Sequence, residues 1–100
     1  NMKEANMADK SDYIEKMKAR LDKLDAEIDQ MQAKAKSAQA DAKAEQADYV
    51  DRLKKEQAQA RDKLKQLQTS SDSAWDDMRK GFESAWDSVS ESFEKARARF

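Results

Sequence analysis

The chain has 100 residues, of which 41% are charged and 38% are hydrophobic, and its formal net charge is −1. So small a net charge excludes a strong overall field that would attract nucleic acid or an anionic membrane. The absence of His and Cys from the sequence removes the usual catalytic bases, thiol nucleophiles and zinc ligands, and it rules out disulfides. We therefore expect no enzyme, no cofactor, no resident metal and no small-molecule substrate.

Residues 1–10 are polar and follow no period, so we expect a frayed N-terminus. They lack the apolar core of a signal peptide, and nowhere does the chain contain the run of about 18 apolar residues that a membrane-spanning helix needs. We expect a cytoplasmic protein, with an exported form whose signal has been removed as the alternative.

Residues 11–68 are predicted to form one long helix. A mean hydropathy of −1.18 would suit a disordered chain, but the apolar residues keep a heptad period, which favours a coiled coil. From residue 33 to 47 the pattern narrows to alanine, which is the best helix former. The bulky first part, here called the N-terminal seam, consists of Ile14, Met17, Leu21, Leu24, Ile28 and Met31.

After Tyr49 the apolar pattern resumes one residue out of phase. A helix absorbs such a skip by local unwinding or by turning its apolar face toward a different neighbour. This second seam consists of Val50, Leu53, Gln57, Ala60, Leu64 and Leu67.

Residues 69–73 read Thr-Ser-Ser-Asp-Ser and predict a turn, because short hydroxyl and carboxylate side chains compete with the helical backbone. Ser73 followed by Asp76 resembles a capping box that would begin a further helix. A continuous helix through the serines is the rival interpretation.

Residues 74–100 are predicted to form an amphipathic helix with a tandem eleven-residue repeat. Ala74-Trp75-Asp76 and Ala85-Trp86-Asp87 open the two copies. Eleven residues make three helical turns plus about 20°, so equivalent side chains share one face. The resulting aromatic stripe consists of Trp75, Met78, Phe82, Trp86, Val89 and Phe93, with Phe100 beyond them.

These elements predict an all-α protein in which the C-terminal helix folds back on the long helix as an antiparallel hairpin or coiled coil. The predicted hairpin core pairs the aromatic stripe with Val50, Leu53, Ala60, Leu64 and Leu67. Because the C-terminal helix is too short to reach residues 14–31, the N-terminal seam is left uncovered. We therefore expect a homo-oligomer, either a dimer or a tetramer, that associates through this seam.

Two functional classes follow. The first is a non-enzymatic structural or interaction protein that acts through self-association. The alternative is an amphipathic protein that associates with lipid or another surface and gains helix on binding, since eleven-residue repeats also build lipid-facing helices. A bundle that binds divalent ions through its carboxylates is a third and weaker interpretation, because the Glu-x-x-His pair of such bundles is absent.

The pattern as a whole resembles a group of small bacterial coiled-coil proteins known as stress-response or uncharacterised coiled-coil proteins. The resemblance implies a bacterial protein of stress tolerance without an enzymatic reaction, and it supplies no catalytic residues. It spans most of residues 11–100 and rests on Tyr13-Ile14-Glu15-Lys16-Met17-Lys18-Ala19-Arg20-Leu21, the alanine stretch 33–47, Arg61-Asp62-Lys63-Leu64 and the tandem that opens with Ala74-Trp75-Asp76-Asp77.

Overall fold

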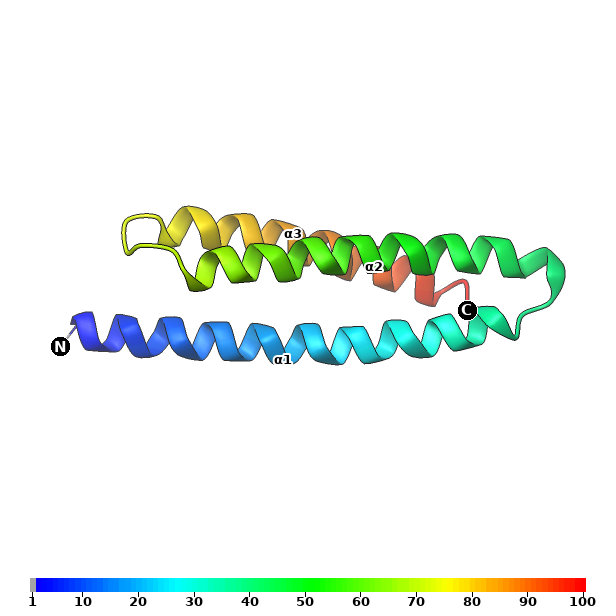
Figure 1. The fold of residues 1–100 in the computed structure, drawn as a ribbon, viewed down its shortest axis with the longest axis horizontal. Helices are drawn as coiled ribbons and strands as arrows, with labels where there is room; N and C mark the ends of the chain where they lie inside the picture. Colours follow the sequence, from blue (N-terminus) through cyan, green and yellow to red (C-terminus); the bar gives the residue numbers. More distant parts are fainter. Residues whose placement is uncertain (1) are drawn as a thin grey trace.

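The computed structural model describes the backbone of residues 2–100 and the side chains of residues 10–100. Three helices follow one another: α1 (Met2–Lys36), α2 (Ala40–Gln68) and α3 (Trp75–Arg97). Together they form a narrow rod of 59 × 19 × 18 Å, in which each helix runs opposite to the one before it (Figure 1). The prediction of an all-α protein is confirmed for the described residues.

The predicted single helix over residues 11–68 is wrong, because the chain turns at residues 37–39. The turn is closed by backbone bonds, among them one from the Ala38 amide to the Ala35 carbonyl at 3.3 Å. Gln39 caps α2 with an extended backbone and no side-chain hydrogen bond. Ser37, whose hydroxyl donates to the Lys34 carbonyl at 3.0 Å, is the one local feature that favours a break, since neither glycine nor proline stands at this point. The break lets α1 lay its apolar face on the rest of the chain.

The helix also starts earlier than predicted. Residues 2–10, expected to be frayed, belong to α1, while Asn1 lies outside the described residues. Between α2 and α3 the chain turns at residues 69–74, where the Thr69 amide bonds back to the Lys65 carbonyl at 3.3 Å and the Ser70 amide to the Leu67 carbonyl at 3.1 Å. The predicted capping box at Ser73 is not formed, because Ala74 is the N-cap of α3 and makes no side-chain capping bond.

Polar contacts at the surface also join neighbouring helices. Asp22 and Arg61 pair at 2.9 Å between α1 and α2. The Ser92 hydroxyl donates to Glu56 at 2.8 Å between α2 and α3. α1 and α2 are close neighbours, and so are α2 and α3, but within the described residues no Cα of α1 lies within 8 Å of a Cα of α3. α1 therefore meets α3 only through side chains.

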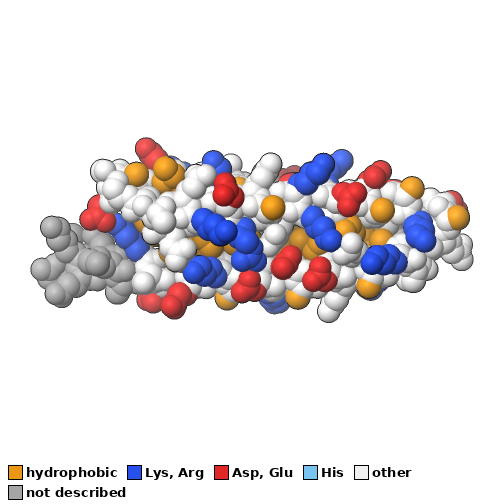
Figure 2. Space-filling view, in the orientation of Figure 1, with side chains coloured by type: hydrophobic (Ala, Val, Ile, Leu, Met, Phe, Trp, Pro, Cys, Tyr) orange, Lys and Arg blue, Asp and Glu red, His pale blue; other side chains and the backbone are white. Residues whose placement is uncertain are grey.

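The surface is strongly charged. Figure 2 shows Lys and Arg interspersed with Asp and Glu along one face, with hydrophobic side chains visible in small patches between them. Mixed charges of this kind keep a thin rod solvated without a dominant sign. None of the helices, over the residues described, combines the length and the apolar character needed to cross a bilayer.

Candidate interaction site

The N-terminal seam lies in the core of the bundle. Its six side chains are at most 8% exposed, and Leu21 and Ile28 are 0% exposed. The prediction that this seam is uncovered is therefore wrong, because the turn at residues 37–39 brings α2 and α3 of the same chain over it. An uncovered seam was the reason for expecting self-association, so association by simple docking of two seams loses its basis.

The predicted hairpin core is divided by the structure into buried and partly buried residues. Met78 is 37% exposed, and Trp75 and Trp86 are only partly buried at the edge of the core. The stripe on α3 is thus buried most deeply around Phe82 and Val89, both 0% exposed. The other predicted members that are buried are Val50, Leu53, Ala60, Leu64, Leu67 and Phe93.

Three further residues are buried that the predicted site did not include: Ala35, Gln57 and Ala96. Ala96 is 0% exposed, and the eleven-residue spacing of Ala74, Ala85 and Ala96 was the signal that would have found it. Gln57 belongs to the second seam but not to the predicted hairpin core.

Gln57 introduces a polar layer into an otherwise hydrophobic core. It is 7% exposed, and its side-chain nitrogen has no hydrogen-bond partner within the described residues. A buried donor left unpaired costs about 1–3 kcal/mol. One polar residue in a helical core also commonly selects a single register at a cost in stability.

Replacing Gln57 by leucine should therefore raise the free energy of unfolding by about 1–2 kcal/mol, because the unpaired amide disappears while the volume is kept. Urea unfolding followed by circular dichroism measures the change. Gln59→Leu, on the exposed side of the same helix, is the matched control and should stay within about 0.5 kcal/mol of the parent. A Gln57→Leu protein no more stable than the parent would mean that the amide is satisfied in solution.

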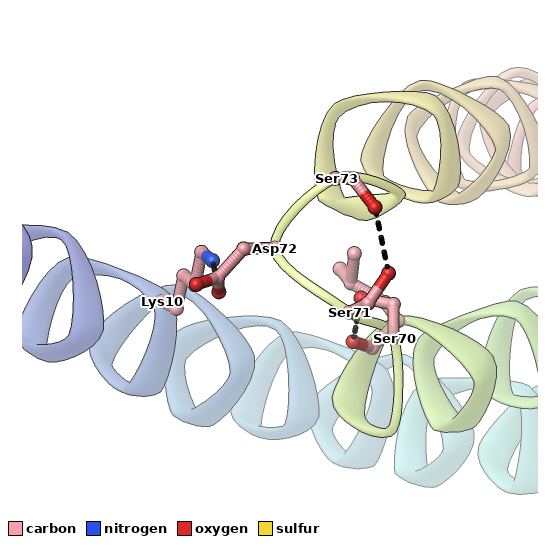
Figure 3. A network of polar contacts seen from close by, with 6 residues as sticks. Lys10, Ser70, Ser71, Asp72 and Ser73 are labelled. Atoms are coloured by element: carbon pink, nitrogen blue, oxygen red, sulfur yellow. Dashed lines mark hydrogen bonds and ion pairs between the residues drawn. The ribbon is translucent and has the colours of Figure 1, made fainter.

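An aromatic cluster around Tyr13 joins α1 to α3. The Tyr13 ring meets Trp75 edge-on at 5.9 Å between centroids and Phe82 at 6.2 Å. Its hydroxyl donates a hydrogen bond of 3.0 Å to Glu83. The Lys10 ammonium lies 5.2 Å from the centre of the Trp75 ring. Lys10 also pairs with Asp72 in the α2–α3 turn (Figure 3). These large side chains bridge α1 and α3, whose backbones are not in close contact.

The same environment raises the pKa of Tyr13 above its ordinary value of about 10, first through burial and then through the bond to Glu83 and its negative charge. A raised pKa in the fold means that the neutral phenol is favoured there. Its contribution to stability is complete below about pH 10 and is lost as the pH rises further.

We expect the parent to lose stability more steeply than Tyr13→Phe as the pH rises above about 10, because phenylalanine has no proton to lose. Urea unfolding of both proteins at about pH 8 and about pH 11 measures the difference. Parallel losses in the two proteins would show that the fold does not hold the Tyr13 proton.

The surface of the bundle carries shallow clefts. One of about 400 Å³ lies between α1 and α3 and is lined by Leu24, Trp86 and Phe93 together with the cationic Arg20 and Lys23. Another, of about 380 Å³, lies between α2 and α3. Among the residues described, Asp and Glu nowhere gather in the groups of three or more that would hold a metal ion. The apolar core between the helices is accordingly the main candidate for a surface that binds another helix.

The chain matches no protein-family model, no curated protein and no solved structure. The resemblance to bacterial stress-response coiled-coil proteins therefore stays a prediction from the sequence, and function has to be argued from the bundle itself.

Proposed function

We propose that this chain is a non-enzymatic structural protein that acts by associating its helices with those of further copies. One observation carries the proposal: α1 supplies seven of the sixteen buried hydrophobic residues among those described, yet it is joined to the rest by a turn of three residues. Nearly half of the core thus lies on one helix that a short turn joins to the other two. The same core can form when α1 of one copy packs on α2 and α3 of another.

The composition supports the same class. A chain without His or Cys lacks the groups that most enzymes use for proton transfer and nucleophilic attack. Its many charges and heptad pattern are typical of proteins that build helical rods and coiled coils. The resemblance stated above would assign such a protein to stress tolerance in bacteria.

Sedimentation equilibrium over a hundredfold range of protein concentration, without lipid, tests the proposal. We expect a dimer or a tetramer whose fraction rises with concentration. A monomer at every concentration would overturn self-association and would favour the second candidate below.

The cleft between α1 and α3 favours one alternative, association with a lipid surface. Trp86 is partly buried there beside Leu24, and the same cleft is lined by three basic and two acidic side chains: Arg20, Lys23, Arg97, Glu27 and Glu94. An amphipathic helix that enters an interface presents aromatic residues flanked by cations in a similar way. Separation of α1 from α3 would expose the part of the aromatic stripe that α1 covers, while α2 would still cover the rest.

Titration with vesicles of zwitterionic and of anionic lipid tests this alternative. It requires low helicity in buffer, a rise in helicity on adding vesicles, and a blue shift of tryptophan fluorescence. Unchanged circular dichroism and fluorescence with both kinds of vesicle would exclude it.

A further inference from the structure

The apolar pattern passes through the turn at residues 37–39 without a change of register. Ala35, Ala38 and Ala42 keep the heptad spacing across it, with Ala35 5% exposed and the other two partly buried. A helix that ran straight through the turn would therefore continue the apolar face of α1 past Ala42, up to the one-residue shift of the pattern after Tyr49. By contrast, the turn at residues 69–74 interrupts the helix with a cluster of hydroxyl side chains.

The end of α1 is closed by a 3.0 Å hydrogen bond from the Ser37 hydroxyl to the Lys34 carbonyl, but the start of α2 has little local support. Gln39 has φ −68° and ψ 157° and makes no side-chain capping bond, and the described backbone contains no residue at positive φ. At the start of α2 the first amides have no intrahelical carbonyl to bond. In a straight helix the amides of residues 39–41 would bond the carbonyls of residues 35–37. Straightening thus adds backbone bonds and uses residues that favour helix.

The core contacts of α1 do not depend on which chain provides them. In the closed chain α1 lies on α2 and reaches α3 through Tyr13. If the turn straightens, residues 2–68 form a helix about 100 Å long, and α1 can no longer reach its own α2. A second straightened copy then offers α1 an identical surface.

We propose that two copies exchange α1 by straightening the turn at residues 37–39, so that each α1 packs on α2 and α3 of the other copy. The proposal rests on the self-association proposed above and names its partner, a second copy of this chain, and the element that moves. Exchange of an identical element is a low-cost route to a two-fold dimer, because each contact of the closed chain is made again.

Concentration decides between the two forms. Within one chain the short turn holds α1 close to α2 at a high effective concentration, so the closed monomer dominates in dilute solution. The exchanged dimer has the same core and two straight hinges, and its fraction of the protein increases as protein concentration rises. Refolding from urea at high concentration should enrich it, because opened chains then meet before they close.

The variant Ala40→Pro should destabilise the exchanged dimer and leave the closed monomer folded. Ala40 is the first residue of α2, where proline is well tolerated, and the extended backbone of Gln39 suits the residue before a proline. In the straight helix the same proline would stand in the interior and break it. We expect a folded monomer whose dimer dissociation constant rises by about 100-fold or more per hinge. Ala40→Gly, the matched control, should weaken the dimer by only about fivefold per hinge.

A cross-link identifies which chain supplies α1. Asp22 and Arg61 lie in contact between α1 and α2, and both are replaced by cysteine in a chain that has no other cysteine. A short bis-maleimide then joins the two positions within one chain in the closed monomer. In the exchanged dimer it joins them between chains, which denaturing electrophoresis separates by mass.

We expect the dimer fraction to give covalently linked chains and the monomer fraction to give internally linked ones. A dimer whose links are all internal would overturn exchange while leaving self-association through another surface intact. A dimer that survives Ala40→Pro unchanged would also overturn exchange. A protein that remains monomeric even after refolding at high concentration would overturn both exchange and the proposed self-association.

Discussion

Replacing Phe82 by alanine should lower the free energy of unfolding by about 3–5 kcal/mol. Phe82 is 0% exposed and is the largest fully buried side chain among residues 10–100. Its ring also packs edge-on against Tyr13, so truncation leaves a cavity and removes an aromatic contact between α1 and α3. A small domain has only about 5–15 kcal/mol of stability in total, so this single change should consume a large part of it.

Met78→Ala is the matched control, since Met78 lies one helical turn before Phe82 and is 37% exposed. Urea unfolding followed by circular dichroism should show a loss of no more than about 1 kcal/mol for this variant. Similar losses at the two positions would mean that α3 is not packed with Phe82 facing inward. The sequence alone ranked Met78 and Phe82 together as members of one stripe.

The double replacement of Leu21 and Leu24 by lysine should abolish the cooperative fold. The two leucines are 0% and 7% exposed in the middle of α1. Losing each buried leucine costs about 2–5 kcal/mol, and an unpaired buried ammonium group adds several more. The sum exceeds the expected stability of the whole domain. We therefore expect α1 to leave the bundle rather than only an oligomer to dissociate.

Tryptophan fluorescence and thermal unfolding measure this effect, because Trp75 loses its contact with Tyr13 when α1 leaves. Ala19→Lys with Ala26→Lys is the control, since both alanines are exposed on the same helix and the charge added is equal. That protein should unfold close to the parent. If the leucine variant stayed as stable as the parent and changed only its mass in solution, α1 would be an interface between chains and not part of the core.

Much of the fold follows from the sequence by itself. Heptad spacing identifies the N-terminal seam on α1, and all six of its residues are buried. The eleven-residue repeat identifies Phe82, Val89 and Phe93 as buried on α3. Both patterns work because a side chain's face on a helix depends only on its position along the helix.

Which residues of a stripe are buried deeply depends on the neighbours in space. Trp86 was expected to lie in the core on the same spacing as Phe82, but it lines a cleft where α1 stands away from α3. Gln57 is buried although it is polar, because residues on both sides of it in α2 belong to the core. Helical periodicity predicts which way a side chain faces. How deeply that side chain is buried depends on the distance to the next helix, which only the assembled bundle sets.

The sequence by itself determined that the chain is helical and which residues face inward, because propensity and periodicity act within a few residues of the chain. Only the tertiary structure decided that three helices are made and that the N-terminal seam is covered from within. Residues 37–39 contain one serine but neither glycine nor proline, and the sequence pattern alone predicts that the helix continues through them. The chain turns there because closing α1 on α2 and α3 removes seven hydrophobic side chains from water, and that gain outweighs a few backbone hydrogen bonds lost at the turn.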